Sequence, residues 1–175
     1  MRIGIDARFL GMKGGLGRYT EKLIKHLEKI DLENDYFVFV RKKGFDFYAP
    51  QNPRFHKVLA DYRWYSFKEQ FFFPFKLYQS KLDLVHFLHF NAPALYFKKF
   101  IVTIHDLTQR GISKNASTLP LPLFYLKKIV YFLVVRSVLK RAKKIIAVSN
   151  FTKKEILKYY KIKANKIAVI YESRD

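Results

Sequence analysis

The sequence predicts an α/β fold with a mostly parallel sheet flanked by helices. Short apolar runs rich in β-branched and aromatic residues alternate along the chain with longer amphipathic segments. The glycines and polar residues that stand out come after the short runs, where parallel sheets bind their ligands. With 175 residues, of which 50% are hydrophobic, the chain is long enough to form one domain with a sizeable core.

The first half of the chain should supply three strands and two helical segments. Residues 2–6 form a short strand ending in Asp6, residues 36–40 a second strand, and residues 55–60 a weaker third strand. Between the first two strands, apolar residues recur at helical spacing, namely Leu16, Tyr19, Leu23, Ile24, Leu27 and Ile30. The aromatic segment 64–79 is expected to be helical in part and to break at Pro74.

The second half continues the alternation. Strands are expected at residues 82–88 and 100–105, followed by a long helix over residues 121–140. A strand at residues 145–149 leads into a helix that ends near residue 160, and residues 167–171 form the last strand. The start of that helix has two readings: Thr152 and Glu155 have the spacing of a capping box, and Ser149 could equally cap an earlier start.

Composition limits the class of protein. The chain has no cysteine, which excludes a disulfide framework, a thiolate zinc site and a cysteine nucleophile. Asp6 and Arg8 lie where a signal peptide would have its apolar region, and the longest apolar run, residues 129–135, is far shorter than the roughly 18 residues of a membrane span. We therefore expect a cytoplasmic location.

The net charge of +20 predicts an anionic partner, either a nucleotide phosphate, a nucleic acid or an acidic membrane surface. A lysine-rich solvated surface would explain the same number. Residues 64–78 and 121–140 both mix aromatic and aliphatic side chains with lysine and arginine, a composition that suits a membrane interface as well as a protein core.

A glycine-rich loop precedes the first helix, with Gly14, Gly15 and Gly17 followed by Arg18. Glycine lets the backbone approach a ligand closely, and a helix N-terminus offers free N–H donors to a phosphate. The dinucleotide fingerprint is absent, because Thr20 stands at the position of its third glycine. A ligand-free flexible turn is the alternative interpretation.

Two further clusters of polar residues follow the ends of predicted strands. His105 and Asp106 follow residues 100–104, and an imidazole there could bond a sugar hydroxyl or stabilise developing charge; Asp106 could instead cap a helix. His89 and Asn91 follow residues 82–88 and suit an acceptor, whereas His86 lies within the strand and is expected in the core. No acid stands at ligand spacing beside these histidines, so we expect no metal and no cofactor.

Taken in order, these motifs resemble the N-terminal domain of the fourth numbered glycosyltransferase family, which has the GT-B fold of two Rossmann-like domains. The matching phrases cover nearly the whole chain: residues 4–8, 14–19, 83–86, Asn91, Pro93, 102–107, 141–142, 147–152 and 166–172. The resemblance is nearest to the mannosyl- and rhamnosyltransferase-like branch.

The resemblance implies a retaining transferase that moves a sugar from a nucleotide-sugar donor to a saccharide or lipid-linked acceptor without a required metal. It implies that Gly14, Gly15, Gly17 and Arg18 approach the donor diphosphate, and that His105, with Asp106, lies beside the transferred sugar. Candidate acceptor contacts are Arg8, His89, Asn91 and Arg110. Peripheral contact with an anionic membrane is expected, and nucleic acid is not an expected partner.

The resemblance also sets expectations for domain organisation. Residues 1–171 would be the acceptor-side domain and residues 172–175 the start of an interdomain linker, with the C-terminal donor-binding domain absent. The chain alone is then expected to be inactive. The alternative hypothesis is a non-catalytic basic module that binds anionic membrane or nucleic acid.

Overall fold

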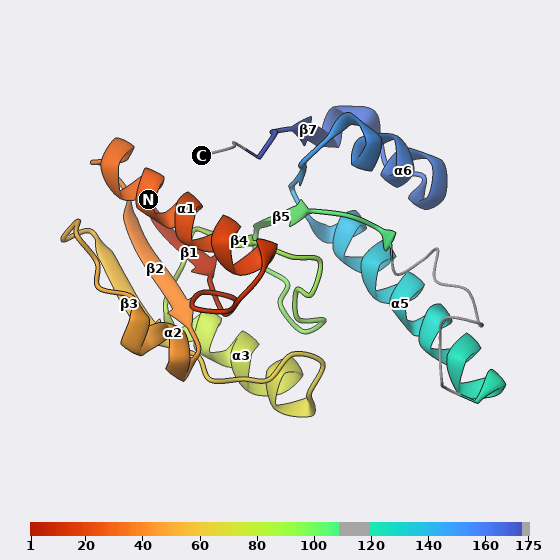
Figure 1. The fold of residues 1–175 in the computed structure, drawn as a ribbon, viewed down its shortest axis with the longest axis horizontal. Coiled ribbons are helices and arrows are strands. Elements are labelled where there is room, and N and C mark those ends of the chain that lie inside the picture. Colours follow the sequence, from red (N-terminus) through yellow and green to blue (C-terminus); the bar gives the residue numbers. More distant parts are fainter. Residues whose placement is uncertain (109–119, 173–175) are drawn as a thin grey trace.

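The structure is a computed structural model and describes residues 1–108 and 120–172. Strands and helices alternate along the chain (Figure 1). The strands are β1 (Arg2–Asp6), β2 (Asp35–Val40), β3 (Phe55–Leu59), β4 (Leu84–Phe87), β5 (Phe100–Ile104), β6 (Lys144–Ala147) and β7 (Ile167–Val169). The helices are α1 (Gly15–Ile30), α2 (Lys42–Phe47), α3 (Phe67–Gln79), α5 (Leu121–Arg141) and α6 (Asn150–Tyr160), with a 3-10 turn η2 (Ala164–Lys166) before β7.

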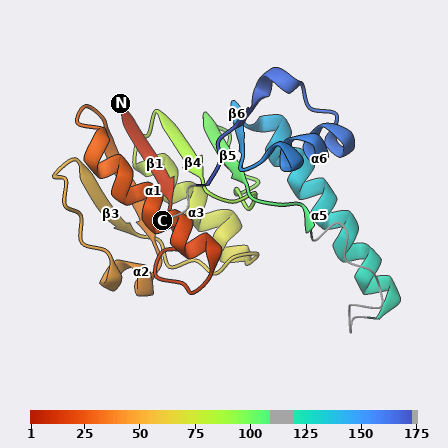
Figure 2. The ribbon, with the colours of Figure 1, turned by 45° about the horizontal axis from the view of Figure 1, so that its top comes forward.

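All strands join one seven-stranded sheet in the order β3-β2-β1-β4-β5-β6-β7, and every pair is parallel (Figure 2). The predicted α/β class, with parallel strands flanked by helices, is therefore confirmed. The order reverses direction between β1 and β4, because the chain first builds outward through β2 and β3 and then returns to the other side of β1. Such a reversal is where open α/β sheets place their ligand crevice.

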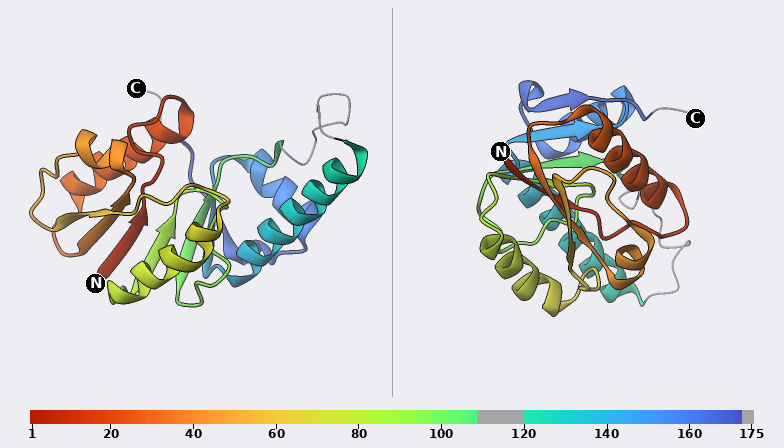
Figure 3. Two further views of the ribbon diagram at one scale, coloured as in Figure 1. Left: turned by 90° about the horizontal axis from the view of Figure 1, so that it is seen from below. Right: turned by 90° about the vertical axis from the view of Figure 1, so that its left-hand side faces the viewer.

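The reversal also decides which helices cover which face. Right-handed crossovers in opposite directions put α1 and α2 on one face and α3, α5 and α6 on the other. Figure 3 shows α1 and α3 on opposite sides of the strands. The two core clusters agree with this arrangement, since Ile24 of α1 packs in one cluster and Phe73 of α3, Val135 of α5 and Ile156 of α6 pack in the other.

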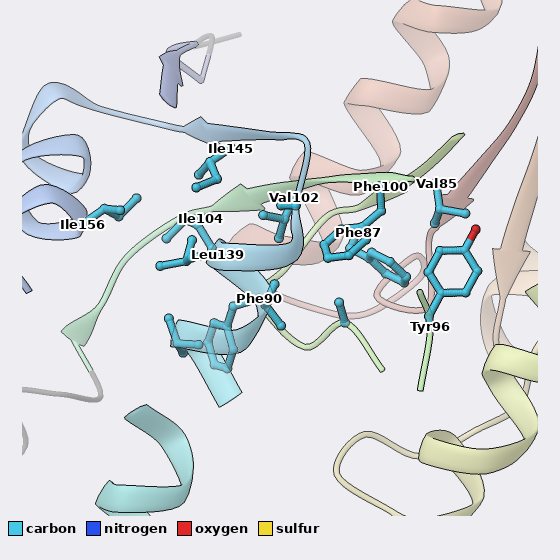
Figure 4. Packing of buried hydrophobic residues seen from close by; sticks show 14 of the residues in the cluster. Val85, Phe87, Phe90, Tyr96, Phe100, Val102, Ile104, Leu139, Ile145 and Ile156 are labelled. Atoms are coloured by element: carbon cyan, nitrogen blue, oxygen red, sulfur yellow. The ribbon is translucent and has the colours of Figure 1, made fainter. Parts of the chain in front are cut away.

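The larger core cluster is built from alternate residues of the inner strands. On β5 the side chains of Phe100, Val102 and Ile104 all face this cluster, and each is at most 2% exposed (Figure 4). Thr103, between them, therefore points to the opposite face and towards α1. This period-two alternation carries the residue after the strand, His105, to the α1 side as well.

One expectation about the helices was wrong and another had been left open. The structure decides both. Helix α3 continues through Pro74 without ending there. Proline costs a helix interior about 3 kcal/mol, but Phe73, Pro74 and Leu77 are all buried, and tertiary packing outweighs that cost. For α6, Ser149 is the N-cap, because its side chain accepts a hydrogen bond from the Thr152 amide at 3.0 Å.

Candidate functional site

Polar residues gather where β1, β4, β5 and β7 end, because parallel strands bring all their carboxyl ends to one edge of the sheet. The loop before α1 follows β1, and the segment 88–92 follows β4. His105 follows β5, and Glu172 lies just beyond β7. The predicted candidates that the structure describes therefore share one edge although they are far apart in sequence.

His105 is held on three sides. Its Nε2 lies 2.9 Å from the carbonyl oxygen of Leu88, and its Nδ1 lies 2.7 Å from Oε1 of Glu172. The edge of its ring meets Tyr19, with ring centroids 4.7 Å apart. A carbonyl can only accept a hydrogen bond, so Nε2 carries a proton. The His105 side chain is only 14% exposed, and its ring plane is fixed by these contacts.

Tyr19 joins the first turn of α1 to this histidine. Its hydroxyl lies 3.4 Å from Oγ1 of Thr103, which in turn lies 2.9 Å from Nε2 of the buried His86. Burial is the main reason why the pKa of Tyr19 is raised, so the phenol stays neutral at physiological pH. The sequence indicated Tyr19 as part of an apolar helix face and of the matching phrase 14–19, and its contact with His105 is visible only in the tertiary structure.

The glycine loop has three kinds of glycine. Gly14 is the N-cap of α1 and has a φ of 107°, which side chains rarely adopt. A Cβ on Gly17 would lie 2.1 Å from the carbonyl oxygen of Met12, so only glycine fits there. Around Gly15 a Cβ would meet no described atom within 4 Å. The exposed start of α1 thus has room for a ligand beside N–H groups that point away from the helix.

Asp106 does not contact the His105 ring. Its Oδ1 accepts hydrogen bonds from the Thr108 amide at 3.0 Å and from the Thr108 hydroxyl at 2.6 Å. Burial opposes the charged form, but the two bonds from Thr108 outweigh it and lower the pKa of Asp106. This contact is typical of a carboxylate that starts a helix or turn, and a catalytic role for Asp106 stays a prediction. Arg110 lies outside the described residues.

Arg8 is the centre of a buried ionic network. It donates from Nε and Nη2 to the two carboxylate oxygens of Asp6 at 2.7 and 2.8 Å, and from Nη1 to Glu69 at 2.6 Å. Glu69 also accepts from Nδ2 of Asn91 and from the Tyr65 amide, each at 2.6 Å. Burial opposes the guanidinium charge, but attraction to Asp6 and Glu69 outweighs it and raises the pKa of Arg8.

This network changes the interpretation of two predicted acceptor contacts. Arg8 and Asn91 are 1% and 3% exposed, and both are bonded to Glu69 of α3 instead of facing open space. In the described structure they join the loops after β1 and β4 to α3, and an acceptor could reach them only if the network opened. No role for Glu69 was predicted from the sequence, where its signal was a lone acid within an aromatic run.

His89 lies beside an aromatic stack at the same edge. Phe9 stacks on Trp64 with ring centroids 4.7 Å apart and meets His89 edge-on at 5.4 Å. The buried atoms Nδ1 of His89 and Nε1 of Trp64 have no hydrogen-bond partner in the part of the chain that the structure describes. Burial, helped by repulsion from His105, lowers the pKa of His89 to about 4, so its imidazole is neutral at pH 7.

The sheet's opposite edge has two hollows of about 350 and 660 Å³, and neither includes a predicted site residue. The smaller one is lined by Lys143, Lys144, Lys161, Ile162, Lys163, Asn165 and Lys166. We place the candidate site at the carboxyl edge, because the glycine loop, the oriented histidine and the strand reversal all lie there. Within residues 1–108 and 120–172, no group of three or more histidine or acidic side chains could hold a metal ion.

Comparison with known proteins identifies the family of the chain and finds solved structures with a similar fold. The sequence profile described as Glycosyltransferase Family 4 matches residues 13–175. A search of curated proteins finds no match.

Solved structures of similar fold include glycosyltransferases and a wall polymer enzyme. The chain aligns to a glycosyltransferase from Rickettsia africae ESF-5 over 98% of its length, with 20% identity and a TM-score of 0.57. It aligns to the wall teichoic acid polymerase TagF over 97% (13% identity, TM-score 0.60) and to the lipopolysaccharide outer core galactosyltransferase WaaB over 99% (17% identity, TM-score 0.58). It spans only 43%, 38% and 46% of these three chains, respectively.

Proposed function

The chain belongs to glycosyltransferase family 4, and from this premise we propose that it is the acceptor-side half of a retaining glycosyltransferase. In this proposal the parent enzyme transfers a sugar from a nucleotide-sugar to a saccharide or lipid-linked acceptor. A second domain binds most of the donor, so the chain alone is inactive. The family resemblance to mannosyl- and rhamnosyltransferases makes a hexose donor the first to test.

One observation carries the proposal: the oriented His105 and the open start of α1 are adjacent. Tyr19 belongs to the first turns of α1 and packs against the His105 ring at 4.7 Å. A donor diphosphate at the N–H groups of α1 would therefore hold its sugar close to the imidazole. Those N–H groups and the partial positive charge of the helix terminus would stabilise the leaving diphosphate as its charge develops.

The Glu172 carboxylate indicates where a ligand oxygen would bind. It lies 2.7 Å from Nδ1 of His105 and its side chain is 45% exposed, so it can be displaced. With Nε2 held on the Leu88 carbonyl, a sugar hydroxyl that replaced Glu172 would donate to Nδ1 of the neutral imidazole, and a developing oxyanion would accept from Nδ1 of the protonated one. The proposed task of His105 is to hydrogen bond the transferred sugar or the charge that develops beside it.

The acceptor would lie over the loops after β1 and β4, near Phe9, Trp64 and His89. Aromatic faces suit the apolar side of a sugar ring. The buried, unpartnered Nδ1 of His89 would bond an acceptor hydroxyl only after the side chains that cover it moved. Arg18 and Arg110 stay predictions as donor and acceptor contacts.

Among the described residues no helix is both long and apolar enough to cross a membrane. We propose peripheral contact with an anionic membrane, cytoplasmic location and no nucleic-acid partner.

The test compares the full product of the parent gene with this chain, using a panel of nucleotide-sugars and measuring both sugar transfer and donor hydrolysis. We expect turnover by the full product, none by the chain alone, and a loss of about 100-fold or more in kcat on His105→Ala. His26→Ala, on the exposed side of α1, is the matched control and should keep full activity. If no donor is consumed, the catalytic proposal fails and the basic binding module becomes the better explanation.

Retention is tested separately on the product. Proton NMR of the new glycosidic bond, taken early in the reaction, should show the same anomeric configuration as the donor. The opposite configuration would contradict retention while leaving the transferase proposal intact.

A further inference from the structure

The outer face of α5 is apolar over its first turns. The exposed fractions of its large apolar side chains lie between 49% and 57% for Leu121, Leu123, Tyr125, Leu126, Ile129, Val130 and Leu133. The inner face of the same helix is also apolar, with Phe124, Val135, Val138 and Leu139 buried against the sheet. A helix that covers one face of a sheet normally buries one stripe and shows polar residues to water. The first half of α5 therefore has more apolar surface than the fold uses.

One stripe along this outer face changes from apolar to basic. Leu126, Ile129 and Leu133 are followed at the same three- and four-residue spacing by Arg136 and Lys140, and all five side chains are exposed. The apolar end and the basic end thus face the same way. Figure 1 shows that the first turns of α5 extend away from the strands, whereas its last turns lie beside β5.

Helix α3 contributes a second apolar stripe on the same side of the sheet. Phe67, Phe71 and Phe75 recur every four residues and are 86%, 60% and 60% exposed. In Figure 3, where the molecule is seen from below, α3 and α5 both lie on the near side of the strands. Single exposed apolar residues are common on protein surfaces, but two helices with apolar stripes on one side indicate a contact surface.

We infer that the outer face of α5, assisted by the α3 phenylalanines, binds the surface of an anionic lipid bilayer. The occupant follows from charge complementarity: the apolar stripe continues into Arg136 and Lys140, and the chain carries a net charge of +20. Apolar side chains of such a helix enter the headgroup and acyl boundary while its basic residues meet lipid phosphates. This inference names the surface for the membrane contact in the proposed function and rests on that proposal only for its biological purpose.

The first test is cosedimentation of the chain with vesicles of phosphatidylcholine and phosphatidylglycerol in equal parts, and with vesicles of phosphatidylcholine alone. We expect binding to the mixed vesicles and much weaker binding to the neutral ones. The triple variant Leu126→Ser, Ile129→Ser, Leu133→Ser should lower partitioning into the mixed vesicles by about tenfold to a hundredfold, because less apolar area enters the interface.

A control variant removes exposed apolar side chains from elsewhere. Ile30 and Leu32, at the end of α1 on the other side of the sheet, are 74% and 69% exposed, so Ile30→Ser with Leu32→Ser should leave vesicle binding unchanged. Circular dichroism and the thermal midpoint of the triple variant should match the wild type, since its substituted side chains are exposed. Equal loss of binding in both variants would contradict the assignment to α5.

The charge is tested with Arg136→Gln and Lys140→Gln. This pair should weaken binding to the mixed vesicles at low salt and change binding to neutral vesicles little, and the difference should shrink as salt rises. Sedimentation equilibrium without lipid tests the rival occupant. If the wild type self-associates, the triple variant is monomeric and vesicle binding is unchanged between them, the face is an interface between copies of the chain and the membrane inference is overturned.

The two proposals fail separately. Vesicle binding is measured without any substrate, so its absence would overturn this inference even if the parent enzyme transfers sugar to a water-soluble acceptor. Binding that depends on the α5 stripe would support it even if no nucleotide-sugar is consumed, in which case the transferase proposal alone would fall.

Discussion

Gly15 and Gly17 lie two residues apart in the first turn of α1, and a side chain would meet different surroundings at each. The Cβ of an alanine at position 17 would lie 2.1 Å from the carbonyl oxygen of Met12, closer than any real contact. At position 15 the same Cβ would meet no described atom within 4 Å. One glycine is therefore needed by the fold, and the other leaves space that the fold does not use.

We predict that Gly17→Ala lowers the free energy of unfolding by about 1–3 kcal/mol, because the loop backbone must move to relieve the contact. Gly15→Ala should change it by less than about 0.5 kcal/mol. Urea unfolding of the chain measures both. In the proposed two-domain enzyme, Gly15→Ala should raise the KM for the donor, since its methyl group would occupy the space that the proposal assigns to the diphosphate. Equal stability of the two variants would contradict the close contact at Gly17.

The buried His86 and the partly buried His89 make the fold sensitive to acid. Burial and repulsion from His105 lower the pKa of His86 and of His89 to about 4, against about 6.5 for an unfolded histidine. As pH falls from about 6.5 to about 4, the unfolded chain takes up protons that the folded chain refuses. The free energy of unfolding therefore has its full value above this pH window and decreases as pH falls through it.

We predict that each of these histidines costs the folded state roughly 3 kcal/mol by pH 4. Urea unfolding between pH 7 and pH 4 measures the loss. His86→Gln can keep a hydrogen bond to Thr103 and should flatten the pH dependence over this window, although it is less stable at pH 7. His26→Gln, on the exposed side of α1, should leave the slope unchanged. Parallel curves for wild type and His86→Gln would refute the assignment.

At the scale of elements, helix ends and packing decide where each helix starts and stops. Ser149 accepts a hydrogen bond from the Thr152 amide at 3.0 Å and so satisfies one of the free donors at the start of α6. Ser66 does the same for the Glu69 amide of α3 at 3.2 Å. Glu69 then faces Arg8, so the cap of α3 also fixes the acid that joins this helix to the loops after β1 and β4.

We predict that Ser149→Ala lowers the free energy of unfolding by about 1 kcal/mol, because the Thr152 amide loses its acceptor. Ser149→Asp should retain most of the stability, since aspartate is an equally good N-cap. The thermal midpoint and urea unfolding of the two variants provide the measurement. If the alanine variant is as stable as the aspartate variant, Ser149 does not act as the cap.

At the scale of the whole molecule, the positive side chains that give the chain its net charge of +20 repel one another. The effect is local at the amino edge of the sheet, where one hollow is lined by Lys143, Lys144, Lys161, Lys163 and Lys166. Lys166 lies partly buried there, and burial, with repulsion from Lys143, lowers its pKa. Such a surface favours encounter with anionic partners and destabilises the compact state when none is present.

We predict that raising sodium chloride from about 20 to about 300 mM raises the thermal midpoint by about 2–5 °C, because salt screens this repulsion. The double variant Lys143→Gln, Lys163→Gln should melt higher than the wild type at low salt and respond less to added salt. Differential scanning calorimetry measures both effects. A midpoint that falls with salt in the wild type would mean that attractive ion pairs, and not repulsion, dominate.

The sequence determined the architecture because the hydrophobic pattern within each segment predicts whether that segment is a strand or a helix. Apolar runs marked the seven described strands, and the 3.6-residue pattern marked α1. The long helix predicted over residues 121–140 corresponds to α5, and the helix predicted from its capping residues corresponds to α6. The short α2 was not predicted, and the break expected at Pro74 did not occur, because burial of the surrounding side chains outweighs local propensity. The motif order also identified the family, which the profile match confirms.

Which side chains meet was decided only by the tertiary structure. The sequence predicts acceptor contacts at Arg8 and Asn91, and that role stays a prediction; the structure adds that Glu69, some sixty residues from Arg8, binds both in the buried network. Tyr19 and Glu172 gave no separate signal and are the partners that orient His105. A sequence pattern reports the face and the strand end on which a residue lies, whereas pairing across the sheet depends on the order of strands and on crossover direction, which bring distant segments to one edge.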